Sequence, residues 1–167
     1  DLTLELAKEQ GIAVDLDGFN DELRKHQDLS RSGASQKFKG GLADTSENSV
    51  KYHTATHLLN AALKHVLGPQ VDQKGSNITS ERLRFDFVHD SKLTDEQKKR
   101  IEEIVNAKIQ ENLPVSFEEM PLENARQLGA VGVFGEKYGE TVKVYSVGDK
   151  TTGNFFSQEI CGGPHVE

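Results

Sequence analysis

Hydrophobic side chains recur every three or four residues in several stretches of this chain, a spacing that is typical of amphipathic helices. The clearest such helix is expected to begin at Asn48 or Ser49, either of which could cap it, and to end at about Leu67, before Gly68 and Pro69. Its apolar face would carry six residues: Ala55, Leu58, Leu59, Ala62, Leu63 and Val66. Three polar residues of this helix would point outward: Thr54, Asn60 and Lys64.

Two shorter helices are expected ahead of it. One covers residues 2–10, and the other begins at Asp15 or Asp17 and runs to about Ser32. Residues 33–47 are rich in serine, glycine and lysine, which is typical of a linker or a long loop. The chain is therefore expected to have three parts: a helical segment over residues 1–32, a linker over 33–47 and a domain over 48–167.

Two further helices are expected inside this domain. Residues 94–97 form a capping-box pattern that opens a helix running to about Asn112. Pro121 would be the first residue of the second helix, which would end at Gly129. The core face of the first would consist of Ile101, Ile104, Val105 and Ile109.

Strict alternation of apolar and polar residues over 82–88 predicts a half-buried strand. Its apolar face would carry Leu83, Phe85 and Phe87. Further strands are expected over residues 115–120, 141–147 and 155–160. Strands and helices follow one another without a βαβ period or an internal repeat. This order predicts an α+β fold, with a mixed or antiparallel sheet packed against helices and a short helical segment in front.

Composition narrows the class of protein. The 167 residues suffice for one sizeable core, and no apolar run is long enough to span a bilayer. The single cysteine excludes an internal disulfide framework and fits a reducing, cytoplasmic location. A net charge of −7 argues against a general nucleic-acid coat protein. Residues 51–110 nevertheless carry 10 basic and 8 acidic side chains, so any contact with a polyanion would be local and central.

Two pairs of residues with the same spacing could bind a metal ion. His53 and His57 lie four apart in the expected helix and would share one face. Cys161 and His165 are also four apart, but the Gly-Gly-Pro between them favours a loop. A thiolate and three imidazoles form a ligand set that suits zinc. Four protein ligands would close a tetrahedral site, whereas catalysis by zinc needs an open position.

Other chemistry remains open on the residues alone. Cys161 could act without a metal, as a thiolate nucleophile with a histidine base. Gly75 and Ser76 could offer backbone N–H groups to a carbonyl or a terminal adenosine, with Gln73 and Thr56 adding hydrogen-bonding groups. The alternative for Gly75 and Ser76 is an ordinary turn between strands.

Several of these motifs occur in the order found in alanyl-tRNA synthetases. They are HTATHLL (53–59), QKGS (73–76), RLRFDF (82–87), VNAKI (105–109), FGEKYG (134–139) and CGGPHV (161–166). Residues 48–167 resemble the editing domain of that family, which free-standing editing proteins and, more distantly, threonyl-tRNA synthetases share. Residues 1–30 resemble the segment just upstream of it.

The resemblance implies an aminoacyl-tRNA deacylase that hydrolyses the ester joining serine or glycine to the alanine tRNA. A pocket for alanine cannot strongly reject either amino acid, so a second, hydrolytic site is needed. By resemblance, zinc would bind four residues: His53, His57, Cys161 and His165. The catalytic residues would be Thr56, Gln73 and Cys161, with Thr56 and Gln73 lining the amino-acid pocket.

The expected partners are the acceptor end of the alanine tRNA and the rest of a synthetase chain. Residues expected to face the tRNA are Lys74, Gly75, Ser76, Arg82 and Arg84. The class II adenylation motifs are absent, which predicts a fragment that cannot charge tRNA by itself. Three departures stand out: Pro164 occupies a position where most alanyl enzymes have threonine and threonyl enzymes have proline, a β-rich insertion is absent, and the chain stops soon after His165. The alternatives are a threonyl-type editing domain and a tRNA-binding or structural zinc module without hydrolytic activity.

Overall fold

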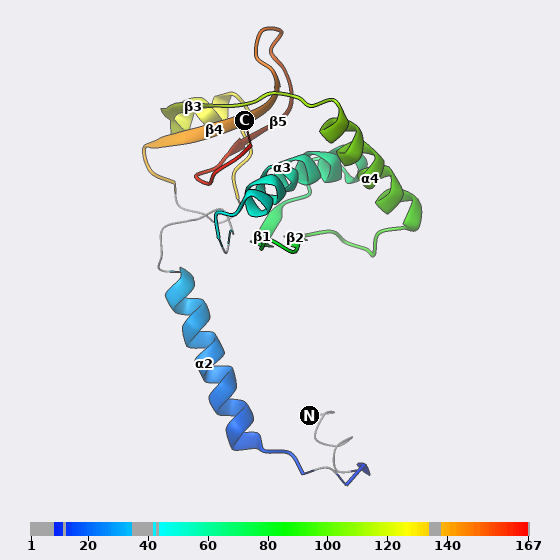
Figure 1. The fold of residues 1–167 in the computed structure, drawn as a ribbon, viewed down its shortest axis with the longest axis vertical. Helices are drawn as coiled ribbons and strands as arrows, with labels where there is room; N and C mark the ends of the chain where they lie inside the picture. Colours follow the sequence, from blue (N-terminus) through cyan, green and yellow to red (C-terminus); the bar gives the residue numbers. More distant parts are fainter. Residues whose placement is uncertain (1–8, 12, 35–41, 43, 134–137, 167) are drawn as a thin grey trace. The chain divides into compact units, whose positions relative to one another are not determined.

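The computed structural model describes residues 9–11, 13–34, 42, 44–133 and 138–166 (Figure 1). The chain divides into two compact units, Asp1–Lys37 and Phe38–Glu167, and each is described by itself. The division falls within the stretch expected to be a linker. Most of that stretch, and nearly all of the helix expected over residues 2–10, lie outside the described residues.

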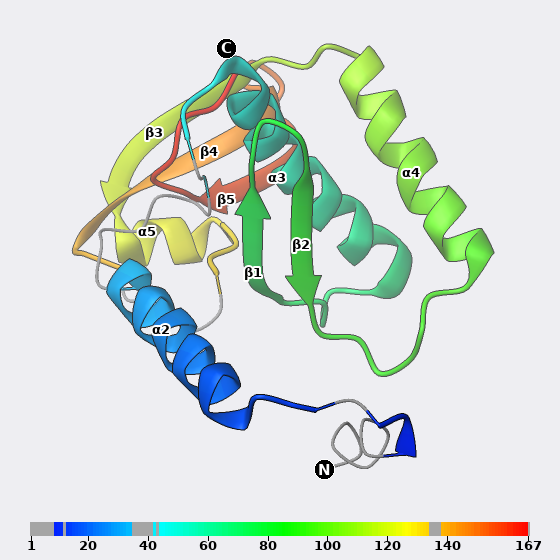
Figure 2. The same cartoon turned by 60° about the horizontal axis from the view of Figure 1, so that its bottom comes forward.

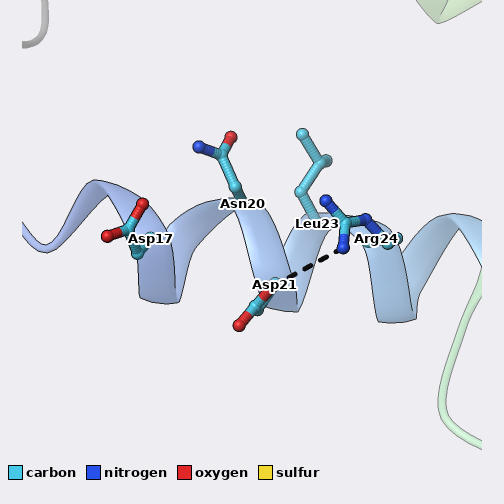
Figure 3. Close-up of a pocket in the computed structure, with 5 residues that line it drawn as sticks. All are labelled: Asp17, Asn20, Asp21, Leu23 and Arg24. Atoms are coloured by element: carbon cyan, nitrogen blue, oxygen red, sulfur yellow. Dashed lines mark ion pairs between the residues drawn. The ribbon is translucent and has the colours of Figure 1, made fainter.

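The first unit contains helix α2 (Leu16–Ala34). Asp15 caps it, as expected for one of the two candidates, because its Oδ1 accepts a hydrogen bond from the N–H of Gly18 at 2.9 Å. Figure 3 shows an open hollow along this helix, lined by Asp17, Asn20, Asp21, Leu23 and Arg24. Asp21 and Arg24 form an exposed ion pair at 3.9 Å. All of these side chains belong to one solvated helix.

The second unit is built around α3 (Glu47–Leu67), which packs against α4 (Asp95–Gln110) and against strands of both sheets (Figures 1 and 2). Ser46 is its N-cap: the Oγ of Ser46 accepts a hydrogen bond from the N–H of Ser49 at 3.3 Å. The expectation that Asn48 or Ser49 caps this helix is therefore wrong. The expected end at Leu67 is confirmed, because Gly68 follows with a φ of 110°, which favours glycine.

Two side chains expected on the outer face of α3 are buried. The exposed fractions of Thr54 and Asn60 are 6% and 1%, so the prediction that they point outward is wrong. The physical reason is that α3 lies between α4 and the sheet that contains β5 (Asn154–Ile160; Figure 2), so the helix has more than one covered face. Polar residues on the second covered face must then find hydrogen-bond partners inside the protein.

In the described part of the chain, five strands form two antiparallel sheets, which confirms the expected α+β class. One sheet is a hairpin of β1 (Gln73–Ile78) and β2 (Leu83–Phe87). The other has the order β3-β4-β5, with β3 at Val115–Pro121, β4 at Thr141–Asp149 and β5 at Asn154–Ile160.

Gly75 and Ser76 lie inside β1, opposite Asp86 and Phe85 of β2. The alternative that they form a turn is therefore wrong. Pro121 precedes α5 (Leu122–Gln127) as its N-cap, so this short helix begins one residue later than expected and ends two residues earlier.

No helix in the described part of the chain is long and apolar enough to cross a membrane. The hydrophobic core of the same part consists of two clusters. The first cluster joins α3 and α4 to the hairpin and consists of Ala62, Leu63, Val71 and Ile101, with Phe85 and Phe87 packed against it. The second joins α5 to the three-stranded sheet and consists of Ala125, Val142, Val144 and Ile160.

Three of the four residues expected on the core face of α4 pack into the first cluster: Ile101, Ile104 and Val105. The prediction for Ile109 is wrong, since 53% of this residue is exposed. Ile109 lies in the last turn of α4, where it lines an open hollow of about 450 Å³ instead of the cluster.

The expected capping box of α4 is present and makes a stability prediction. Thr94 Oγ1 accepts from the N–H of Gln97 at 3.2 Å, and Gln97 Oε1 accepts from the N–H of Thr94 at 2.9 Å. Thr94→Ala removes the first bond and is expected to lower the free energy of unfolding by about 1 kcal/mol, measured by urea denaturation. The control, Ser91→Ala in the exposed loop before the cap, should change it by less than about 0.5 kcal/mol. Equal losses in the two variants would contradict a role for the box.

Candidate metal centre

Four potential metal ligands that are far apart in the sequence meet in the structure. Helix α3 carries His53 and His57 one turn apart, and the chain leaving β5 supplies Cys161 and His165. One ligand atom from each lies within 4.8 Å of the others, so the cluster could hold a metal ion. The Sγ of Cys161 is 3.4 Å from the Nε2 of His53 and 3.4 Å from the Nε2 of His165.

The outer nitrogen of each histidine in this cluster is held by an acceptor. His53 Nδ1 donates to the carbonyl of Pro164 at 2.8 Å, because a carbonyl oxygen can only accept. His57 Nδ1 donates to Oε2 of Glu159 at 2.6 Å. His165 Nδ1 lies 3.2 Å from Oγ1 of Thr54.

Thr54 can act as the acceptor for His165 because its own proton has another destination. Its Oγ1 donates to the carbonyl of Val50 at 3.3 Å and also accepts from the N–H of Val166 at 3.2 Å. The hydroxyl oxygen therefore receives the Nδ1–H of His165 as a second donor. In the neutral form that binds a metal, all three histidines then carry their proton on Nδ1 and present the lone pair of Nε2 to the centre of the cluster.

The Nε2 of His57 supports this assignment. It is buried and has no hydrogen-bond partner among the described residues. A buried ring nitrogen without a hydrogen-bond partner is rare in folded proteins, because it loses its hydration without compensation. Its position among two further Nε2 atoms and one sulfur fits a metal ion as the missing partner.

Glu159 contacts the candidate metal centre, and sequence reasoning missed it. Its exposed fraction is 6%, and its Oε1 accepts hydrogen bonds from Asn60 Nδ2 at 2.9 Å and Ser157 Oγ at 3.3 Å. The available signal was the alternation along β5, since Ser157, Glu159 and Cys161 are two apart and share one face. A glutamate on the same strand face as the single cysteine of the chain is a candidate to contact the metal-binding cluster.

The metal-free cluster is strongly polarised. Burial lowers the pKa of His57, but the carboxylate of Glu159 and the sulfur of Cys161 raise it to about 10. Burial raises the pKa of Cys161, but hydrogen bonds from His165 and His53 and the positive charge of His57 lower it to about 3. Burial also lowers the pKa of His165, to about 4. Without a metal, Cys161 is therefore a thiolate and His57 keeps an extra proton, which a bound cation would displace.

The residues expected to line a substrate pocket, Thr56 and Gln73 among them, are not members of the four-residue cluster. Thr56 is buried, and its Oγ1 donates to the carbonyl of Tyr52 at 2.8 Å. Within the described residues, the threonine hydroxyl that contacts the histidine cluster is that of Thr54. Gln73 pairs with Phe87 at the start of β1, and Gly75 lies opposite Asp86.

The residues expected to meet tRNA lie on the hairpin of β1 and β2 or beside it. Lys74 and Arg84 are exposed on β1 and β2, and Arg82 is exposed just before β2. Arg84 forms an ion pair with Asp86 at 3.1 Å. Within the described residues, neither Arg82 nor Arg84 forms a hydrogen bond or an ion pair with the histidine cluster.

Comparison with known proteins finds relatives of a single kind among those named below. No family model matches the sequence. Over its full 167 residues, the chain is 56% identical to the alanine–tRNA ligase of Treponema denticola, and the match covers 27% of that protein. Over 166 residues it is 55% identical to the alanine–tRNA ligase of Treponema pallidum, of which the match covers 26%. The alanine–tRNA ligase of Bacillus subtilis is 46% identical over 145 residues, which are 84% of this chain and 16% of that protein. The chain thus spans about a quarter of the length of its Treponema relatives, and over that length it is similar to one segment of the alanine–tRNA ligases.

Proposed function

We propose that this chain carries the editing activity of an alanine–tRNA ligase and hydrolyses the ester of serine or glycine mischarged onto the alanine tRNA at a zinc centre. The observation that carries the proposal is the convergence of three Nε2 lone pairs and one thiolate within 4.8 Å, each histidine fixed by an acceptor on its Nδ1. The motifs resembling the editing domain contain all four of these residues.

Zinc is the ion that this ligand set favours, because borderline-soft zinc combines thiolate with imidazole readily. When bound, zinc would supply a Lewis acid that polarises the ester carbonyl and lowers the pKa of water. Four protein ligands fill a tetrahedral set, so access of the substrate to the ion requires either a fifth coordination position or the displacement of one protein ligand. The protein's own contribution is to hold the ligands in one buried cluster and to fix the tautomer of each histidine.

We assign substrate recognition to Thr56 of α3 and to residues of the β1–β2 hairpin. The oxygen of Thr56 can still accept a hydrogen bond from a serine hydroxyl, although its proton is committed to Tyr52. We assign Gln73, Gly75 and Ser76 to the amino-acid and adenosine pocket. Lys74, Arg82 and Arg84 are assigned to the acceptor end of the tRNA, where Arg84 would have to exchange its contact with Asp86 for one with phosphate. We also propose that this chain works together with the rest of a synthetase chain, in the cytoplasm.

A metal-free cysteine hydrolase is the second candidate, and one observation favours it. Glu159 accepts a hydrogen bond from Nδ1 of His57, and His57 and Cys161 belong to the cluster whose ligand atoms lie within 4.8 Å of one another. The three residues could therefore serve as orienting acid, base and nucleophile, an acid that the sequence alone did not identify. Against it, the exposed fraction of Cys161 is 4%, so its sulfur is poorly placed to attack a bulky ester.

A deacylation assay combined with a zinc measurement tests the proposal. Seryl- and glycyl-tRNA(Ala) should be hydrolysed, alanyl-tRNA(Ala) should be spared, and the purified protein should contain one zinc per chain that chelation removes together with activity. Hydrolysis that survives removal of the metal would favour the cysteine hydrolase. Zinc and tRNA binding without hydrolysis of any of the three esters would identify a structural module.

A further inference from the structure

We propose that Glu159 is a positioning residue for the metal centre, holding His57 with its Nε2 toward the ion and balancing the charge of the buried site. The inference rests on the metal-dependent site proposed above. The two ligand motifs, residues 53–59 and 161–166, do not contain this residue. Glu159 lies in β5, two residues before Cys161. The structure assigns it through its contacts.

The geometry of the carboxylate is fully specified from both sides. Oε2 accepts from His57 Nδ1 at 2.6 Å, while Oε1 accepts from Asn60 Nδ2 and from Ser157 Oγ. Asn60 lies three residues after His57, on the same side of α3. Ser157 and Cys161 flank Glu159 at two-residue spacing along and just beyond β5. The elements that deliver the ligands therefore also deliver the groups that fix Glu159.

Charge distinguishes Glu159 from the other two histidine supports. His53 and His165 are held by neutral acceptors, the carbonyl of Pro164 and the hydroxyl of Thr54. A divalent cation bound to one thiolate and three neutral imidazoles keeps one net positive charge. Three of the four ligands are buried, and an uncompensated charge in such surroundings is costly. The carboxylate of Glu159 cancels it and makes His57 a stronger ligand.

Glu159→Gln removes the charge and nearly keeps the shape. The glutamine Oε1 can still accept from His57 Nδ1. Its amide nitrogen would face Asn60, whose Oδ1 has no hydrogen-bond partner among the described residues and becomes an acceptor if that side chain turns over. The substitution therefore tests the charge without opening a cavity in the core.

The experiment measures metal affinity by competition with a chelator, using zinc and then cobalt(II) as a spectroscopic probe. Glu159→Gln is expected to bind zinc about 10–100-fold more weakly than the parent protein, with a shifted cobalt absorption spectrum. The matched control is Glu119→Gln, which removes an exposed carboxylate of β3 that pairs with Lys143. It should leave both zinc affinity and spectrum unchanged.

The possible results separate the two proposals. Unchanged zinc affinity and an unchanged cobalt spectrum in Glu159→Gln would overturn the role of Glu159 while leaving the zinc centre in place. A parent protein that binds no zinc would overturn the metal-dependent function itself, and with it the inference. If Glu159→Gln does not fold, Ser157→Ala takes its place: losing one bond to the carboxylate should weaken zinc binding about fivefold, and no loss would overturn the inference.

Discussion

Replacing Cys161 by alanine is expected to abolish zinc retention and to lower the hydrolysis of seryl-tRNA(Ala) by at least about 100-fold. Cys161 is the anionic member of the ligand cluster, and its Sγ lies 3.4 Å from two of the three Nε2 atoms. Loss of a supporting residue around a metal costs about 10–100-fold in affinity or activity, so loss of the thiolate ligand should cost no less. Zinc content and single-turnover deacylation measure the two effects.

The control for this substitution is a truncation of similar size on the neighbouring strand. Ser146 is a buried residue of β4 whose Oγ accepts from Gln158 Nε2 at 3.2 Å. Ser146→Ala should cost about 1 kcal/mol of stability and leave zinc content unchanged. Full hydrolytic activity in Cys161→Ala would rule out both the zinc mechanism and the cysteine nucleophile.

Gly163→Ala is expected to displace His53 and weaken zinc binding at least about 10-fold, although it changes no ligand. A Cβ at this position would lie 2.3 Å from Cε1 and 2.9 Å from Nδ1 of His53. The imidazole cannot retreat easily, because its Nδ1 is bound to the carbonyl of Pro164 and its ring stacks on His165 with a centroid distance of 4.2 Å. The added methyl group must therefore push either the ring or the loop out of place.

Chelator competition measures this effect, and urea unfolding shows whether the rest of the domain is intact. Gly139→Ala is the matched control, since that glycine is exposed and a Cβ there would meet its nearest neighbour, the carbonyl of Thr141, at an ordinary 3.8 Å. It should bind zinc like the parent protein. Parent-like zinc affinity in Gly163→Ala would show that the loop yields and that the position of His53 tolerates the added group.

The local patterns of the chain predicted much of the fold. The capping box at Thr94 is present, α3 ends at Leu67, and the alternating residues of β2 place Phe85 and Phe87 against the core. Each of these features depends on neighbours within about one helical turn or on the two-residue period of a strand, both of which can be read directly from the sequence. Errors arose where burial depended on distant elements, as for Ile109 at the end of α4.

The candidate site divides in the same way. Its four candidate ligands could be identified from the sequence, because residue type and four-residue spacing express the preferences of a metal ion directly. The supports could not be identified from spacing. Glu159 meets His57 across 102 residues, and Thr54 meets His165 across 111. The sequence by itself determined which residues can bind a metal and which local elements carry them. Only the tertiary structure decided which faces of α3 are covered, and therefore which polar side chains orient the histidines, because burial depends on packing between segments that are far apart in the chain.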